Sequence, residues 1–348
     1  MLTSEFDYYL PKELIAQVPA QKRDQSRLLI LHRESGQIEH KQFPVLLECL
    51  QPNDVLVVND SKVIPARLYG TNREKSGEVE ILLIKRTGEK QWSAMVQPGK
   101  RARECAKLSF GDGLLTGEVI GISEEGYREI VFEYQGTWES VIAQLGVMPV
   151  PPYIERSHEM RDKLELDKSR YQTVYAKEEG SIAAPTAGLH FTEDFLNQIK
   201  EKGIDIAKVT LHVGTGTFLP VKTDKIEDHP LHSEWFSLTQ ERVNQIHSAK
   251  QVGGRVITVG TTSCRVLESV ADDKGNLKSC SGNTNLFIYP GYKFKIVDCL
   301  LTNFHLPKST LLMLISAFAG KEKIMKAYQE AVQEKYRFYS YGDAMLII

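Results

Sequence analysis

The sequence predicts an α/β protein: a mixed, largely parallel sheet domain with an inserted small antiparallel β-barrel domain. Three observations support this class. With 348 residues, the chain is longer than one compact core usually serves, which favours two domains. Residues 67–133 show short strand patterns with turn signals and no long helix. After residue 151, strand patterns alternate with helical ones.

The first clear element is the strand within DVLVVND, residues 54–60. Its apolar run is continuous, as in a parallel strand that is buried on both faces. We assign this strand to the same sheet as the later strands. The α/β domain is therefore discontinuous, with residues 1–65 and 151–348, and the barrel is an insertion at residues 66–150.

Turn dipeptides divide the inserted region into strands. Thr-Gly, Pro-Gly, Gly-Asp-Gly and Glu-Gly separate strand-length apolar runs between residues 77 and 134, which predicts a small antiparallel barrel or sandwich. TWESVIAQLG follows as a helix with Thr137 as N-cap and Gly146 beyond its end. VMPVPPYI is expected to be an extended linker because each proline disfavours helix at the preceding residue.

Helices and strands then alternate to the end of the sequence. A helix in residues 192–203, capped by Thr192 and stopped by Gly203, precedes the strand IAKVTLHVG. A second helix, in residues 237–254, has a capping-box spacing of Ser237 and Gln240 and precedes the strand RVITVG. We further expect a helix from about Ser263 and strands at NLFIYPG and KIVDCLL. A last helix at residues 321–336 has the apolar face Ile324, Ala327, Tyr328, Ala331 and Val332.

Composition restricts the class of protein. The net charge of −2 gives no general attraction to nucleic acid or membrane, so a polyanion would need a local basic patch. The N-terminal residues lack the apolar segment of a secretory signal, and LLMLISAFAG is about half the length of a membrane-spanning helix. Five scattered cysteines suggest neither disulfides nor a thiolate site. We therefore expect a reduced, cytoplasmic protein.

Common cofactor motifs are missing. GTGTFLP lacks the third glycine and the following helix of a dinucleotide-binding motif, and no P-loop occurs. His229, His232 and Glu234 in HPLHSEWF are unevenly spaced, which is a weak metal signal, so we predict no metal site.

Polar residues follow several of the predicted strands, and this is the main structural argument for a site. If these strands are parallel, their carboxyl ends meet in one crevice, which is where open α/β sheets bind ligands. The residues at these ends are Asn59, Asp60, His212, Gly214, Thr215, Gly216, Gly260, Thr261, Thr262, Ser263, Arg265, Thr302, Asn303 and His305.

Each of these motifs also has a structural interpretation. His212 suits a hydrogen-bonded strand end, and His190, in SIAAPTAGLHFT, could cap the helix that follows. GTTSCR fits a plain helix N-cap, or alternatively an anion site at a helix N-terminus. The residues alone leave these alternatives open.

Two segments have compositions that suit nucleic acid. GKRARECAK gathers Lys100, Arg101, Arg103 and Lys107, and YRFYSYGD interleaves aromatic residues with Arg337. A solvated barrel edge and a core strand explain the same two segments, and composition alone favours these explanations.

Long motifs along the chain closely resemble the bacterial S-adenosylmethionine:tRNA ribosyltransferase-isomerases of queuosine biosynthesis. The resemblance extends from FDYYLPKELIAQVPA to the C-terminus. The motifs are VVNDSKVIPARL, PPYI, SIAAPTAGLHFT, TLHVGTGTFLPV, HSEWF, VGTTSCR, LTNFHLPKSTLLMLI and YRFYSYGDAMLI. The family is described as an α/β domain with an inserted β-barrel, in agreement with the pattern above.

The resemblance implies a specific reaction. The ribosyl part of S-adenosylmethionine is transferred to 7-aminomethyl-7-deazaguanine at the tRNA wobble position and rearranged, which gives epoxyqueuosine and releases adenine and methionine. S-adenosylmethionine is then a co-substrate, no true cofactor is required, and the partner is tRNA. We expect no membrane partner and a monomer.

The resemblance also suggests roles. His190 and His212, with His305 behind them, are the candidates for the base, because imidazole suits proton transfer near neutral pH. Asp60 is a candidate for countering the sulfonium or orienting the amine. Arg67 or Arg265 would bind the methionine carboxylate, aided by the N–H groups of Thr261, Thr262 and Ser263. The remaining candidates for the substrate pocket are Asn59, Thr186, Gly188, Gly214, Thr215, Gly216 and Asn303. The candidates for tRNA binding are Lys100, Arg101, Arg103, Lys107, Arg337 and Tyr339.

Two other functions compete with this one. A methyltransferase would use the same co-substrate but leave S-adenosylhomocysteine. A non-catalytic RNA-binding factor would need no cluster of His, Asp, Thr and Arg at the strand ends.

Overall fold

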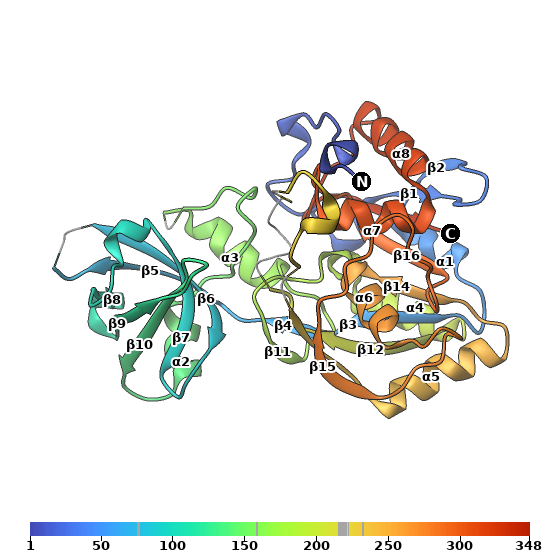
Figure 1. Cartoon of the computed structure of the whole chain (residues 1–348). Coiled ribbons are helices and arrows are strands. Elements are labelled where there is room, and N and C mark those ends of the chain that lie inside the picture. Colours follow the sequence, from blue (N-terminus) through green and yellow to red (C-terminus); the bar gives the residue numbers. More distant parts are fainter. Residues whose placement is uncertain (75–76, 158, 215–220, 222, 232) are drawn as a thin grey trace. The chain divides into compact units, whose positions relative to one another are not determined.

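The computed structural model describes residues 1–74, 77–157, 159–214, 221, 223–231 and 233–348, which form two compact units (Figure 1). The first unit comprises Met1–Lys62, Pro151–Glu155 and Gln172–Ile348. The second comprises Val63–Val150 and Arg156–Tyr171. The segment Arg156–Tyr171 lies beyond our expected boundary at residue 150 but groups with the barrel.

A nine-stranded mixed sheet forms the centre of the first unit. Its order is β15-β13-β12-β3-β14-β16-β17-β1-β2. The four strands β12, β3, β14 and β16 run parallel to one another. β13, β15 and β2 are antiparallel additions, and β17 pairs parallel with β1 and antiparallel with β16. The bounds are β1 Arg27–Leu31, β2 Ile38–Gln42, β3 Val55–Asn59, β12 Asp205–Leu211, β13 Glu234–Leu238, β14 Val256–Val259, β15 Cys280–Thr284, β16 Cys299–Asn303 and β17 Ala344–Ile347. The predicted class of this sheet is confirmed.

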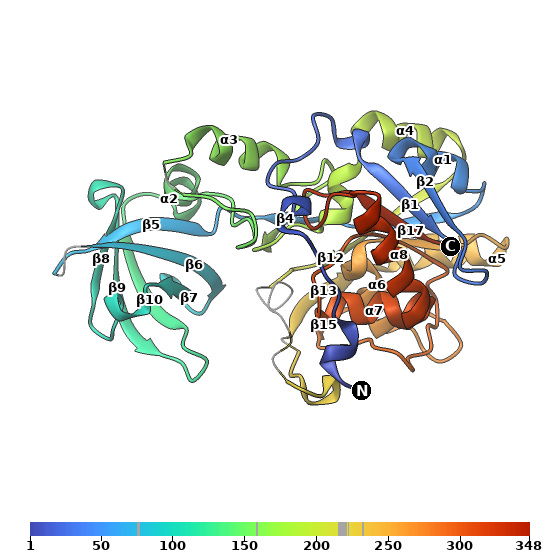
Figure 2. The ribbon, with the colours of Figure 1, turned by 90° about the horizontal axis from the view of Figure 1, so that it is seen from above.

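Helices cover both faces of the sheet, which explains the continuous apolar run of β3. Val55 and Val57 enter one core, which also contains residues of α5 (Gln240–Gln251), α6 (Gly260–Val270), α7 (Thr310–Ala319) and α8 (Lys321–Gln333). Leu56 and Val58 enter the other core, with α1 (Leu46–Cys49) and α4 (Glu193–Glu201). Figure 2 shows α1 and α4 on one side of the strands and α6 and α7 on the other. A strand covered in this way has no solvent face and therefore needs no polar alternation.

Several predicted helix ends are confirmed. The Thr192 hydroxyl accepts a hydrogen bond from the Phe195 N–H at 3.1 Å, and Gly203 has a φ of 82° just beyond α4. In α8 the predicted face is buried, with Val332 partly buried beside it. The capping box of Ser237 and Gln240 is wrong. Ser237 pairs with Thr210 inside β13, so the backbone is still a strand there, and Thr239 is the N-cap of α5.

Two predicted strands are also misplaced. Residues 285–291 form no strand, and the edge strand is instead β15. KIVDCLL becomes regular only from Cys299, where β16 begins. The Glu268 carboxylate accepts hydrogen bonds from the N–H groups of Lys295, Ile296 and Val297 at 2.9, 3.1 and 3.1 Å. The buried Glu268 carboxylate therefore accepts the hydrogen bonds that these backbone N–H groups would otherwise donate to a neighbouring strand. Sequence periodicity does not reveal such a contact.

The second unit contains a closed antiparallel barrel of order β10-β7-β6-β5-β8-β9, as predicted. Thr137 caps α2 (Trp138–Leu145), and Trp138 stacks on Trp92 with ring centroids 5.2 Å apart. The same unit contains α3 (Arg161–Arg170). The barrel strands are β5 Arg67–Asn72, β6 Glu78–Arg86, β7 Gln91–Gln97, β8 Lys107–Phe110, β9 Leu115–Ile122 and β10 Arg128–Tyr134. A short sheet pairs β4 (Ser61–Val63) with β11 (Glu178–Ser181).

Within the part of the chain that the structure describes, no helix combines the length and apolar character needed to cross a bilayer.

Candidate active site

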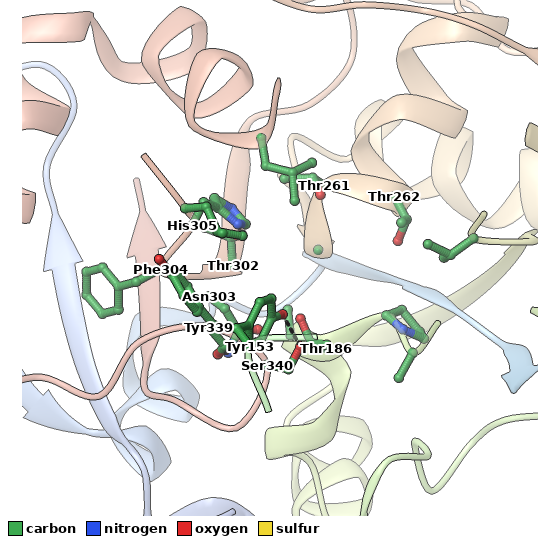
Figure 3. Close-up of a pocket in the computed structure, with 17 residues that line it drawn as sticks. Tyr153, Thr186, Thr261, Thr262, Thr302, Asn303, Phe304, His305, Tyr339 and Ser340 are labelled. Carbon is green, nitrogen blue, oxygen red and sulfur yellow. Dashed lines mark hydrogen bonds between the residues drawn. The ribbon is translucent and has the colours of Figure 1, made fainter. Parts of the chain in front are cut away.

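A pocket of the first unit lies at the carboxyl ends of the parallel strands β14 and β16 (Figure 3). The start of α6 and the segment that follows β16 form two of its walls. A small-residue segment and two tyrosines complete the lining. The lining residues are Tyr153, Ala184, Pro185, Thr186, Ala187, Val213, Gly260, Thr261, Thr262, Thr302, Asn303, Phe304, His305, Leu306, Leu311, Tyr339 and Ser340. The predicted convergence of strand ends therefore holds for these two strands.

The N-terminus of α6 offers hydrogen-bond donors to this pocket. Gly260 has a φ of 86°, which lets the chain turn sharply from β14 into the helix. Val259 precedes it without a side-chain cap, so the first N–H groups of the helix keep no intrahelical partner. The buried Thr262 hydroxyl also lacks a hydrogen-bond partner among the residues that the structure describes. Together these groups suit a negatively charged or strongly accepting part of a ligand.

His305, after β16, is the histidine that lines the pocket. Its Nε2 hydrogen bonds to the Thr302 hydroxyl at 2.8 Å, and its backbone N–H donates to the Tyr328 hydroxyl at 2.9 Å. Burial lowers the pKa of His305 to about 3, so the ring is neutral near pH 7. Its Nδ1 has no hydrogen bond to any residue of the described chain and is available to a ligand.

His190 lies behind the pocket lining and not in it. The ring is 5% exposed, stacks on Phe43 at 5.1 Å, and hydrogen bonds through both nitrogens. Nδ1 lies 2.8 Å from the Ser26 hydroxyl and Nε2 lies 3.1 Å from Asn303 Nδ2. Burial, with Arg337 and Arg23 nearby, lowers the pKa of His190 to about 3. The sequence predicted His190 as a candidate base, and in the structure both of its ring nitrogens are already hydrogen bonded to protein.

The small residues before His190 serve two different purposes. Thr186 and Ala187 line the pocket, as expected of a segment that lets a ligand approach. Gly188 instead packs on protein, because an added Cβ would lie 2.0 Å from the Tyr175 hydroxyl and 2.8 Å from Thr173 Cγ2. Its small size is required by packing and not by the pocket.

The ends of β3 and β12 form a separate polar cluster. Asp60 Oδ1 accepts a hydrogen bond from the Thr210 hydroxyl at 2.8 Å, and burial raises the pKa of this carboxyl. The His212 ring stacks on Trp235 at 4.9 Å, and burial lowers its pKa. The Asn59 side chain bonds the backbone N–H and C=O of Leu211, both at 3.0 Å, and so extends the strand pairing. None of these side chains lines the pocket.

The predicted carboxylate-binding arginines both have protein partners, although the buried Arg265 Nη2 has no hydrogen-bond partner among the described residues. Arg265 is buried and forms an ion pair with Glu234, and its Nε donates to the Leu286 carbonyl at 3.1 Å. Glu234 also accepts the Gly214 N–H at 3.0 Å, and the Ser263 hydroxyl donates to the Val259 carbonyl at 3.0 Å. These contacts give Arg265, Gly214 and Ser263 structural partners outside the pocket lining.

Arg67 belongs to the barrel unit, where it lies 2.9 Å from Glu80 and donates to the Val150 carbonyl at 2.9 Å. Thr215 and Gly216 lie outside the described residues.

The two predicted tRNA-binding segments differ in exposure. In the barrel unit Lys100, Arg103 and Lys107 are exposed, and Arg101 donates to the Glu78 carbonyl at 2.8 Å. In YRFYSYGD the aromatic residues are buried, so they form no surface stacking platform. The segment is not the expected core strand either, because β17 begins only at Ala344. Arg337 is partly buried and donates to the Val18 carbonyl, while Tyr339 forms part of the pocket wall.

Tyr153 and Ser340 are among the pocket residues that the sequence did not predict. Tyr153 donates to or accepts from the Ser340 hydroxyl at 2.7 Å, and its ring lies 4.6 Å from that of Tyr339. The PPYI motif marked Tyr153 as part of a family pattern, but the linker around it gave no indication of where the ring would lie. Among the described residues no group of three metal-binding side chains comes together; His232 of the expected weak cluster lies outside them.

Comparison with known proteins gives consistent matches over the whole chain. Residues 3–347 match the model of a family described as queuosine biosynthesis protein. The S-adenosylmethionine:tRNA ribosyltransferase-isomerases of Clostridioides difficile (strain 630) and Clostridium kluyveri (strain NBRC 12016) are 55% and 52% identical over 347 residues, with 100% of each chain covered. A crystal structure of S-adenosylmethionine tRNA ribosyltransferase from Thermotoga maritima has 39% identity and a TM-score of 0.56, and the match covers 99% of this chain and 100% of that one.

Proposed function

This chain belongs to the queuosine biosynthesis family of S-adenosylmethionine:tRNA ribosyltransferase-isomerases, and on that premise we propose which reaction it catalyses. It transfers the ribosyl moiety of S-adenosylmethionine to the aminomethyl group of 7-aminomethyl-7-deazaguanine in tRNA. The product is epoxyqueuosine, and adenine and methionine are released. S-adenosylmethionine is a co-substrate, and no other cofactor is needed.

The observation that carries this proposal is the pocket at the ends of β14 and β16. The uncapped start of α6 and the Thr262 hydroxyl suit the carboxylate of the methionine part. The tyrosines Tyr153 and Tyr339 offer ring surfaces for the adenine, and Ala184 and Ala187 leave room beside them. Helix donors thus replace the arginines in this role, because Arg265 is paired with Glu234.

The reaction begins at the ribose carbon next to the sulfonium. The positive sulfur acidifies the C5′–H, and loss of this proton starts the expulsion of adenine. The amine of the tRNA base then forms the new C–N bond, and methionine leaves with the sulfur electron pair. His305 lines the pocket and its Nε2 is bonded to Thr302, so we assign proton transfer to its Nδ1, and Asp60 and His212 remain candidates for handling the incoming amine.

Product analysis tests the reaction directly. Purified protein is incubated with S-adenosylmethionine and tRNA that carries the aminomethyl-deazaguanine, and adenine and methionine are followed by chromatography. Equal release of both, dependent on that base, is the expected result; tRNA with unmodified guanine is the control. S-adenosylhomocysteine would instead identify a methyltransferase, and tight tRNA binding without any turnover would indicate an RNA-binding factor.

The proposal also includes the position of the target base in tRNA, the cellular compartment and the oligomeric state. The modified base lies in the anticodon loop, where an unpaired nucleotide can leave the stack and enter a pocket. We place the reaction in the cytoplasm, with the enzyme acting as a monomer.

A further inference from the structure

The orientation of the Asn303 side chain is fixed by its hydrogen-bond partners. One branch of the amide lies 3.2 Å from the Tyr339 carbonyl oxygen and 3.4 Å from the Asp343 carbonyl oxygen. Carbonyl oxygens only accept, so the atom facing them is the amide nitrogen Nδ2. The other branch, Oδ1, is buried and has no hydrogen-bond partner in the described part of the chain, and Asn303 lines the pocket.

This orientation determines the protonation of His190. The same Asn303 Nδ2 lies 3.1 Å from His190 Nε2, and because the amide nitrogen donates, Nε2 must accept. A neutral imidazole that accepts at Nε2 has its proton at Nδ1, which donates to the Ser26 hydroxyl at 2.8 Å. The Phe43 ring stacked on the imidazole, at 5.1 Å, prevents the ring from turning freely.

We propose that Ser26 and His190 are positioning residues that hold Asn303 with its Oδ1 facing the pocket, where it accepts a hydrogen bond from an N–H or O–H donor of S-adenosylmethionine. The assignment of this donor to S-adenosylmethionine rests on the proposed function. The hydrogen bonding of Ser26, His190 and Asn303 does not.

An acid–base role of His190 would require different contacts. A base that takes a proton from substrate must reach it within hydrogen-bond distance, or through one water. Both ring nitrogens of His190 are already used, and the ring is 5% exposed behind the lining. Protonation at Nε2 would put a donor against the Asn303 amide nitrogen, which is itself a donor.

Histidine side-chain NMR tests the protonation state without any turnover. In the ¹⁵N-histidine-labelled protein, we expect the His190 signals to show Nδ1 protonated and Nε2 unprotonated, unchanged between pH 5 and 8. The signals are assigned by their loss in His190→Gln or, if that variant does not fold, by their shift in Ser26→Ala. In Asn303→Asp the atom facing Nε2 becomes an acceptor, so Nε2 should gain a proton. A His190 that titrates in this range, or is protonated at Nε2 in the unmodified protein, overturns the proposal.

Binding and kinetics test the consequence for the pocket. Loss of one neutral hydrogen bond weakens binding by about two- to tenfold. We expect Ser26→Ala and His190→Gln to raise the Kd of S-adenosylmethionine, measured without tRNA, by that factor. The kcat should stay within about threefold and the pH profile should keep its shape. Matched controls are Ser316→Ala, whose hydroxyl bonds the Leu312 carbonyl in α7, and His247→Gln, which accepts the Leu277 N–H; neither lines the pocket.

The outcomes separate the two proposals. A loss of 10² or more in kcat together with a lost limb of the pH profile would make His190 an acid or base and overturn the positioning role. An unchanged Kd in Ser26→Ala, His190→Gln and Asn303→Ala would also overturn it. If product analysis fails while the tautomer and the Kd changes hold, the proposed reaction falls and the positioning role stands.

Discussion

At the scale of single residues, the pocket is defined by polar atoms that the fold leaves without partners. Buried polar groups in folded proteins are nearly always hydrogen bonded, because leaving one unpaired costs free energy. The Thr262 hydroxyl and Asn303 Oδ1 are two exceptions, and both belong to residues that line the pocket. We interpret them as groups that a ligand satisfies.

The first prediction concerns Thr262. Thr262→Val keeps the shape of the side chain and removes its unpartnered hydroxyl, so the free energy of unfolding should change little. The affinity for S-adenosylmethionine should fall by up to about tenfold, measured by calorimetry. Thr258→Val is the matched control: its hydroxyl contacts the Cys299 carbonyl at 3.4 Å, away from the pocket, so affinity should be retained. Equal affinity in both variants would remove Thr262 from the binding site.

The second prediction concerns acid stability. The pKa of His190 and of His305 is lowered to about 3, whereas an unfolded histidine titrates near 6.5. Between these values the unfolded chain binds protons that the folded chain does not, so stability falls as the pH falls. Each histidine contributes a slope of up to about 1.4 kcal/mol per pH unit. Burial raises the pKa of Asp60, which acts in the opposite direction.

Urea unfolding at a series of pH values between 7 and 4 measures this slope. His190→Gln should reduce it by the share of one histidine. A free energy of unfolding that stays flat from pH 7 to pH 5 would contradict the buried neutral state of both rings.

At the scale of elements, close packing between elements explains part of the small-residue composition that the sequence analysis attributed to a ligand site. The segment 183–190 is poor in large side chains for two reasons: part of it lines the pocket, and Gly188 packs against Tyr175. Similarly, the Glu268 carboxylate accepts hydrogen bonds from three backbone N–H groups before β16, so that strand begins only at Cys299. Both effects come from contacts between elements that are distant in the sequence.

The third prediction concerns Gly188. Gly188→Ala places a methyl group 2.0 Å from the position of the Tyr175 hydroxyl, so we expect a loss of about 1–3 kcal/mol in the free energy of unfolding. Because the Tyr175 hydroxyl has no hydrogen-bond partner, Tyr175→Phe should cost little and should restore part of the loss in the double variant. Gly282→Ala in β15 meets no atom within 4 Å and is the control. A fully stable Gly188→Ala would show that the contact is not tight.

At the scale of the whole molecule, charge limits the way in which RNA can bind. The chain has a net charge of −2, so attraction to the phosphate backbone must come from a local patch. Lys100, Arg103 and Lys107, which the sequence predicts to contact tRNA, are exposed in the barrel unit. We infer a small footprint of few phosphate contacts.

The fourth prediction is a shallow salt dependence of tRNA binding. Three exposed basic side chains predict a slope of log K against log salt of about −2 to −3, since each phosphate contact contributes about 0.7–0.9. Lys100→Ala and Arg103→Ala should each make the slope less steep by the contribution of one contact, about 0.7–0.9. Lys278→Ala, which changes an exposed lysine of the other unit, should leave the slope unchanged. A slope that implies ten or more contacts would rule out this footprint.

The sequence by itself determined the class of fold, most of the elements and the family. The continuous apolar run of β3, the Thr192 and Thr137 caps and the Gly203 helix stop are local signals, which depend on neighbouring residues along the chain. The turn signals that marked the barrel are of the same kind. Long motifs such as SIAAPTAGLHFT and LTNFHLPKSTLLMLI supplied the family.

Only the tertiary structure decided which of the polar residues share a site. It brought Asn303 beside His190 and Tyr339, and Tyr153 beside Ser340, across 113, 36 and 187 residues of sequence. It also paired Arg265 with Glu234 and set His190 behind the pocket. A residue's type and spacing indicate the chemistry that its side chain can perform. Its burial and its partners depend on packing between distant elements, and these contacts separate a residue that borders a ligand from one that holds the wall behind it.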